Sequence, residues 1–157
     1  DIKPNAGHKA VAELEKMGKV KAVITQNIDD LHQAAGSRNV LELHGTLKKW
    51  YCLECGKRNN KSFDCECGGI VRPQVTLYGE MLDEEVTSRA IIEKADTLII
   101  VGTSLTVYPA AYYLNYFSGK NLVILNETPT SQDGKAQLVI RDNFSKVMTE
   151  TMKLLNK

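Results

Sequence analysis

The clearest indicator of the fold class is Thr97-Leu-Ile-Ile-Val-Gly-Thr-Ser104, an apolar run that ends in a glycine and two hydroxyl side chains. A continuous apolar run of this length is typical of a strand that is buried on both faces of a parallel sheet. Asn121-Leu-Val-Ile-Leu125 repeats the pattern and is followed by Asn126. Helical periodicity precedes and follows these runs, so the sequence predicts an α/β fold with a doubly wound parallel sheet.

The segments on either side supply the remaining elements of such a sheet. Pro4 and Asn5 are helix start signals and Gly18 is a stop signal, which bounds the first expected helix. Helices are expected over 4–17, from Asp29 or Asp30 through Ala35, over 84–94 after an Asp83 cap, over 109–117 and over 144–155. Strands are expected over 20–24 and 40–43, with an extended segment over 73–79 and a short last strand over 137–140.

Polar or titratable side chains stand at the carboxyl ends of the expected strands. In chain order they are Gln26, Asn27 and Asp29, then His44, then Thr103 and Ser104, then Asn126. Ligands of doubly wound sheets bind beyond these strand ends, so the pattern predicts a shared crevice for a ligand. Taken singly, each of these residues is also an ordinary turn former.

A second feature is the group of cysteines in Cys52-Leu-Glu-Cys55 and Cys65-Glu-Cys67. Two close pairs of thiols are the ligand pattern of a structural zinc site, and four thiolates leave no open position for catalysis. The polar segment 56–64 between the pairs has no apolar periodicity, so a metal is its natural support. The alternatives are free core thiols, or disulfides, which need an oxidising compartment that no signal-type segment indicates.

Composition narrows the class of partner. The chain has 157 residues, of which 43% are hydrophobic, and a net charge of +1. That size suits one domain with a small appendage. The absence of a basic stripe argues against direct nucleic-acid binding, and no apolar run reaches membrane-spanning length. The chain begins at Asp1 without a methionine, so we expect a piece of a longer protein.

Taken in order, the motifs resemble the sirtuins, the silent-information-regulator family of NAD-dependent protein deacylases. The resemblance extends over nearly the whole chain. His8, in the helix before the first motif, also matches, and both His8 and His32 are interpreted as structural. The matching motifs are Pro4-Asn5, Thr25-Gln-Asn-Ile-Asp29, Leu31-His32, Ala35-Gly-Ser37, His44-Gly45, the paired cysteines, Gly79-Glu80, Gly102-Thr-Ser-Leu105 and Asn126.

The resemblance implies an enzyme with NAD as co-substrate and a structural zinc ion. It would transfer the acyl group of an acylated lysine to ADP-ribose and release nicotinamide, a chemistry classed as transferase or hydrolase. His44 matches the general base, and imidazole titrates near neutrality as that role requires. Asn27 and Asp29 match the residues that bind the nicotinamide carboxamide.

The resemblance also implies a set of binding residues. Gln26 would contact the nicotinamide ribose and Ile28 would form an apolar wall of the same pocket. The adenosine half of NAD would be contacted by Gly102, Thr103, Ser104, Asn126, Glu127 and Phe144. The acyl-lysine peptide would add as a strand along the extended segment that includes Val75, Thr76 and Tyr78.

The implied architecture is a partial, Rossmann-like parallel sheet with a small zinc-ribbon lobe. Residues 1–47 and 73–157 would form the incomplete NAD-binding domain, and residues 48–72 the zinc module. The glycine-rich loop that opens the family's NAD site has no counterpart here, so we expect the chain alone to be weakly active or inactive. Reduced thiols that hold a metal favour the cytoplasm.

Two alternatives stay open at the level of sequence. A protein mono-ADP-ribosyl transferase on the same scaffold would use NAD and the same pocket. A non-catalytic, zinc-containing binding module would have no need for His44 and Asp29 together.

Overall fold

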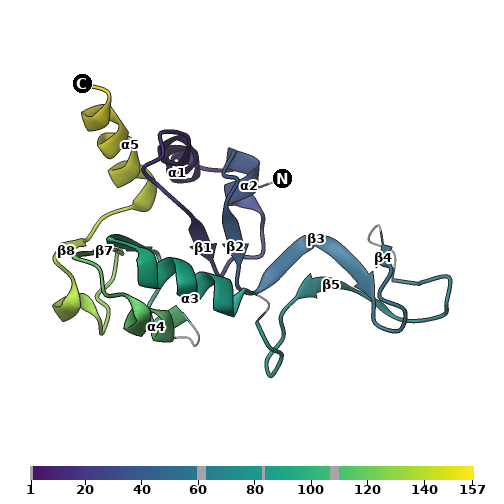
Figure 1. The fold of residues 1–157 in the computed structure, drawn as a ribbon. Coiled ribbons are helices and arrows are strands. Elements are labelled where there is room, and N and C mark those ends of the chain that lie inside the picture. Colours follow the sequence, from purple (N-terminus) through teal and green to yellow (C-terminus); the bar gives the residue numbers. More distant parts are fainter. Residues whose placement is uncertain (1, 60–62, 83, 107–109) are drawn as a thin grey trace.

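The computed structural model describes residues 2–59, 63–82, 84–106 and 110–157 (Figure 1). Its helices are α1 (Ala6–Lys16), α2 (Leu31–Ala35), α3 (Glu85–Lys94), α4 (Ala110–Tyr113) and α5 (Phe144–Leu155), with 3-10 turns over Leu114–Tyr116 and Asp133–Lys135. Its strands are β1 (Val23–Thr25), β2 (Val40–Glu42), β3 (Gly45–Cys52), β4 (Arg58–Asn59), β5 (Val71–Val75), β6 (Thr97–Val101), β7 (Asn121–Leu125) and β8 (Leu138–Ile140).

The parallel strands form two separate sheets. β1 pairs with β2, and β6, β7 and β8 pair in that order, all in parallel. Helices lie on both sides of β1 and β2, with α1 and α2 above them and α3 below them in the view of Figure 1. The predicted α/β class is therefore confirmed, but within the described residues no ladder joins the two parallel sheets.

Two apolar clusters hold these layers together. Ala10 and Leu14 of α1 pack against Met148 of α5, so these two helices form one unit. Leu43 and Ile92 form the second cluster with Tyr113, Ile24 and Leu98, which brings both parallel sheets against α3 and α4. Burial of these side chains is the main stabilising contribution, at about 25 cal/mol per Å² of apolar surface.

α1 begins where the sequence indicates. The side chain of Asn5 accepts the backbone N–H of His8, and the side chain of His8 reaches back to the backbone N–H of Asn5. Such a reciprocal capping box satisfies two donors that the first helical turn leaves free. The interpretation of His8 as a structural residue agrees with this placement.

Two details of the predicted elements are wrong. β6 is not buried on both faces, since Ile99 is 50% exposed. β6 is an end strand of its sheet, and the described residues leave part of it uncovered. The predicted helix over 109–117 is an α-helix only to Tyr113 and then a 3-10 turn to Tyr116. Its predicted start at Pro109 and the Asp83 cap lie outside the described residues.

The third sheet is antiparallel and carries the cysteines. β3 lies between β4 and β5, with a register shift between Thr46 and Trp50. This sheet extends away from the helices as an arm (Figure 1). It spans residues 45–75, whereas the predicted zinc module spans 48–72, and those domain boundaries stay a prediction.

Candidate functional site

A pocket of about 650 Å³ opens where β1 and β2 end and the antiparallel arm begins. One wall is the loop after β1 together with His44, and the other wall is the segment after β5. The pocket therefore brings together eight of the predicted site residues. It is lined by Gln26, Asn27, Ile28, Asp29, His44, Val75, Thr76, Leu77, Tyr78, Gly79, Glu80 and Leu82.

His44 is held in one tautomer. Its Nδ1 lies 3.0 Å from the main-chain carbonyl oxygen of Gln26. Because a carbonyl oxygen only accepts hydrogen bonds, Nδ1 must carry the proton. In the neutral ring Nε2 is then the basic nitrogen, which is the state that a general base requires.

The loop after β1 is shaped by its own side chains. Thr25 Oγ1 accepts the backbone N–H of Asn27, and Asp29 Oδ1 accepts that of Leu31 at 3.0 Å. Asp30 adopts a left-handed backbone with φ of 60°, and its side chain makes no cap hydrogen bond. The start of α2 is therefore capped by Asp29, while Asp30 turns toward the neighbouring strands.

The sequence did not predict a polar network that lies next to the His44-Gly45 turn. Thr46, which is 2% exposed, donates a hydrogen bond to Asp30, and Gln33 donates one to Glu42 at 2.9 Å. Burial, followed by the hydrogen bond with Asp30, raises the pKa of Glu42. The network joins Glu42 and Thr46, which lie on either side of the His44-Gly45 turn, to Asp30 and Gln33 at α2. A carboxylate inside the apolar strand Val40–Glu42 was the available signal.

Gly45 sits where no other residue fits without strain. Its φ is +72°, and a Cβ there would lie 2.0 Å from the carbonyl oxygen of Gln74. β3 and β5 therefore come together beside His44, and the carbonyl of His44 accepts the backbone N–H of Thr76 at 3.0 Å. This contact connects the two walls of the pocket.

The predicted adenosine-binding residues lie elsewhere, after β6 and β7 and, for Phe144, at the start of α5, and none of them lines this pocket. Thr103 Oγ1 accepts the backbone N–H of Leu105, and Ser104 bonds the hydroxyl of Thr106. Asn126 donates its side-chain amide to the carbonyl of Thr128. These residues are tied into local turns, and their role stays a prediction.

The other residues predicted to contact the adenosine half of NAD are Gly102, Glu127 and Phe144, and they too lie outside the His44 pocket. Gly102 has a φ of +61°, a left-handed conformation that glycine adopts without strain. Glu127 accepts a hydrogen bond from Asn143 at 3.1 Å. Phe144 packs over Gly7 of α1, where a Cβ would lie 2.3 Å from its ring. The predicted contacts of Glu127 and Phe144 with NAD stay predictions.

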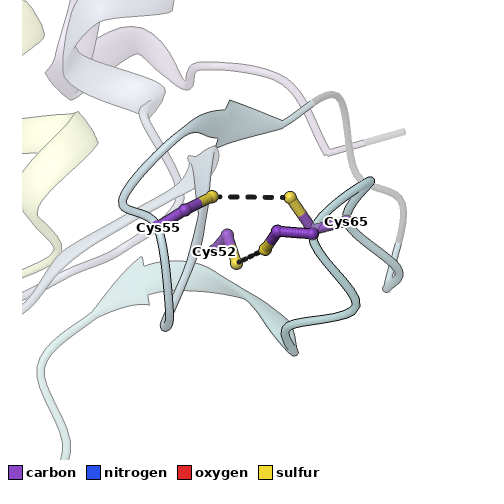
Figure 2. A group of neighbouring side chains, drawn as sticks. Cys52, Cys55 and Cys65 are labelled. Carbon is purple, nitrogen blue, oxygen red and sulfur yellow. Dashed lines mark hydrogen bonds between the residues drawn. The ribbon is translucent and has the colours of Figure 1, made fainter.

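The four cysteines meet at the end of the arm (Figure 2). Their sulfur atoms all lie within 4.8 Å of one another. The close pairs join the two motifs, with Cys52 to Cys67 at 3.5 Å and Cys55 to Cys65 at 3.6 Å. With Zn–S bonds of about 2.3 Å, tetrahedral sulfurs are about 3.8 Å apart, so the thiols fit a zinc ion.

The acid–base chemistry of these thiols reflects the closeness of the four sulfur atoms. Backbone N–H groups of Cys55 and Glu54 lower the pKa of Cys52 to about 7. A hydrogen bond from Gly69 lowers the pKa of Cys67, but the neighbouring thiols raise it to about 12. Four thiolates at this spacing repel one another unless a divalent ion compensates their charge. A zinc ion held by Cys52, Cys55, Cys65 and Cys67 would supply that charge and support the arm.

The fold and the site define an α/β protein with a histidine-lined pocket beside a thiolate metal module. The chain belongs to the Sir2 family, whose model matches residues 1–109.

Two bacterial relatives named NAD-dependent protein deacetylase are similar in sequence. The protein of Fusobacterium nucleatum subsp. nucleatum is 65% identical over 158 residues, covering 99% of this chain and 63% of the relative. That of Clostridium perfringens is 54% identical over 158 residues, covering 93% and 65%. The chain thus spans somewhat less than two thirds of the length of these relatives.

A solved structure described as "Sir2-p53 peptide-NAD+" is similar in fold. It superposes with a TM-score of 0.92 at 35% identity and covers 98% of this chain and 71% of that one. Within the described part of the chain, none of the helices has the length and apolar character needed to cross a membrane.

Proposed function

We propose that this chain supplies the pocket and zinc module of an NAD-dependent protein-lysine deacylase. The observation that carries the proposal is the arrangement of His44, Asn27 and Asp29 in one pocket, with Nδ1 of His44 held by a carbonyl. The names of the bacterial relatives and the NAD and peptide in the similar solved structure support it.

Each residue has a role that its chemistry allows. NAD would be the co-substrate that provides a nicotinamide leaving group and an ADP-ribose acceptor for the acyl group. Nε2 of His44 would take the proton of a ribose hydroxyl. The amide of Asn27 and the carboxylate of Asp29 would hydrogen-bond the nicotinamide carboxamide, and Asp29 keeps one oxygen for this because Oδ1 caps α2.

The remaining assignments belong to the same proposal. Gln26 and Ile28 would complete the nicotinamide side, and the acylated peptide would lie along Val75, Thr76 and Tyr78. The adenosine half of NAD would contact Gly102, Thr103, Ser104, Asn126, Glu127 and Phe144. The zinc ion would be structural, within a module of about residues 48–72 between the two parts of the NAD-binding domain, 1–47 and 73–157. We also propose the cytoplasm as its compartment, where thiols stay reduced.

The decisive experiment compares two histidine variants, expressed with any flanking sequence that the gene encodes. His44→Tyr should lower turnover of an acetyl-lysine peptide by about 100-fold or more, because general-base catalysis contributes that much. His8→Gln is the matched control, since glutamine at the third helical position also completes a capping box. Unchanged turnover in His44→Tyr would remove the residue from the mechanism.

The product separates deacylation from transfer to protein. A deacylase converts NAD, water and the acylated peptide to nicotinamide, the deacylated peptide and O-acyl-ADP-ribose, and mass spectrometry detects O-acyl-ADP-ribose as a small molecule. ADP-ribose mass on the peptide instead would contradict the proposal, as would the absence of any NAD-dependent product.

A further inference from the structure

An ion pair outside the proposed catalytic set closes one wall of the pocket. Arg72 of β5 makes two parallel contacts with Glu80, Nη1 to Oε1 at 2.7 Å and Nη2 to Oε2 at 3.2 Å. The guanidinium also donates a hydrogen bond to the carbonyl of Val75. A two-point contact of this kind fixes direction as well as distance, which a single lysine ammonium does not do.

Glu80 uses its second oxygen on the main chain of the same segment. Its Oε2 accepts the backbone N–H of Leu77 at 2.8 Å, and its own backbone N–H donates to the carbonyl of Leu77 at 3.0 Å. Gly79, with φ of +89°, makes this turn possible. The segment from Val75 to Glu80 is thus closed on itself around the side chain of Arg72.

An ordinary surface ion pair would not hold a segment of main chain in place. Exposed pairs contribute little, and Arg89–Glu93 on α3 is an example, with one i,i+4 contact and half-exposed side chains. In the Arg72–Glu80 pair the carboxylate is 43% exposed, but the side chain of Arg72 is only 18% exposed. The contacts with Arg72 and Leu77 hold the pKa of Glu80 below its usual range, so its carboxylate is ionised at neutral pH.

The closed segment is the wall that faces His44. Val75 to Glu80 line the pocket, whereas Arg72 does not. Arg72 is paired with Tyr51 of β3, next to the pair formed by Val71 and Cys52. The position of this wall is therefore set from the cysteine-bearing sheet, through a side chain that touches no proposed ligand.

We propose that Arg72 is a positioning residue for the acyl-lysine substrate, acting through Glu80 to hold the main chain of residues 75–80 opposite His44. This inference rests on the proposed function. The class of ligand affected is the acylated peptide and not NAD, because the predicted NAD contacts lie on the other wall and at the ends of β6 and β7.

The test measures both substrates in the Arg72→Met variant of the protein with its gene-encoded flanking sequence. We expect the KM for an acetyl-lysine peptide to rise about tenfold, as for the loss of a charge-assisted hydrogen bond, with the KM for NAD within about twofold of the parent. Arg72→Lys should restore part of the loss, and Arg72→Met/Glu80→Gln should be no worse than Arg72→Met alone. Arg89→Met is the matched control and should change neither constant.

Hydrogen exchange gives a readout that does not depend on activity. The Leu77 amide should exchange faster in both Arg72→Met and Glu80→Gln, while amides of α1 stay as protected as in the parent. An unchanged peptide KM with unchanged Leu77 exchange overturns the proposal. So does a parallel loss of stability and of affinity for both substrates, including in Arg72→Lys, which would make Arg72 a general structural residue.

A failure of the proposed function can be distinguished from a failure of the proposed role of Arg72. If the parent protein turns over no acylated peptide, the deacylase assignment fails while exchange at Leu77 still decides whether Arg72 holds the wall. Faster exchange then supports the positioning role and unchanged exchange refutes it.

Discussion

Replacing Gly45 by alanine tests how tightly β3 and β5 are joined beside His44. A Cβ at Gly45 would lie 2.0 Å from the carbonyl oxygen of Gln74, well inside the 3.0 Å that real Cβ contacts respect. The two strands must therefore separate by at least about 1 Å at this point. That shift would weaken the backbone hydrogen bonds on either side of this point, the one from Thr76 N–H to the carbonyl of His44 and those of the Thr46–Gln74 pair, each worth about 1 kcal/mol.

Gly18 provides a matched control for the backbone. Its φ is +71°, against +72° at Gly45, and nothing lies within 4 Å of its added Cβ. Gly18→Ala therefore has only the left-handed penalty, about 1 kcal/mol, partly offset by the reduced entropy of the unfolded chain. Gly45→Ala should cost about 2 kcal/mol more than the control, a factor of about 30 in the unfolding equilibrium.

The assay is urea unfolding of the zinc-bound chain, with both variants and the parent compared at one pH. Equal free energies of unfolding for Gly45→Ala and Gly18→Ala would refute the steric argument. A hydrogen-exchange map provides the second check, because the loss should be confined to β3, β5 and the turn at His44.

Three further outcomes follow from the same structure. Cys55→Ser should lower the zinc content per chain measured by atomic absorption, and retained zinc in the variant would contradict the four-thiolate site. Chelation of the metal should expose the amides of β3 to hydrogen exchange before those of α1. Leu43→Ala should cost about 3 kcal/mol in urea unfolding, because Leu43 is 2% exposed. Leu47→Ala, at 46% exposure, should cost less than about 1 kcal/mol. Burial lowers the pKa of His32, so the unfolded chain binds more protons and stability should fall as pH drops below about 6.5. His32→Gln should flatten that pH dependence in urea unfolding, and an unaltered slope would rule the residue out.

Much of the parallel framework could be predicted because it depends on local pattern. The apolar runs Thr97–Val101 and Asn121–Leu125 coincide residue for residue with β6 and β7, and the last helix coincides with α5. β3 was missed because Gly45–Cys52 lacks apolar alternation and gains its strand structure from distant partners, β4 and β5. The division into two parallel sheets could not be predicted from the sequence either, because it depends on which strands pair.

The candidate site likewise contains features that the sequence could predict and features that it could not. The rule of strand ends predicted the meeting of Asn27 with His44, because it needs only the order of the elements. Ser104 is bonded to Thr106 and does not line the His44 pocket, so its predicted contact with NAD stays a prediction. Arg72 could not be predicted, since its role depends on a turn that brings Glu80 back to it.

His44 is attached on both sides, by its ring to the main chain of Gln26 and by its own carbonyl to the main chain of Thr76. The pocket therefore cannot widen beside His44 without displacing the imidazole. Under the proposed function, longer or bulkier acyl chains would be accommodated elsewhere along the lining, for example beside the exposed Tyr78, so tolerance for acyl size and alignment of His44 would be separable properties.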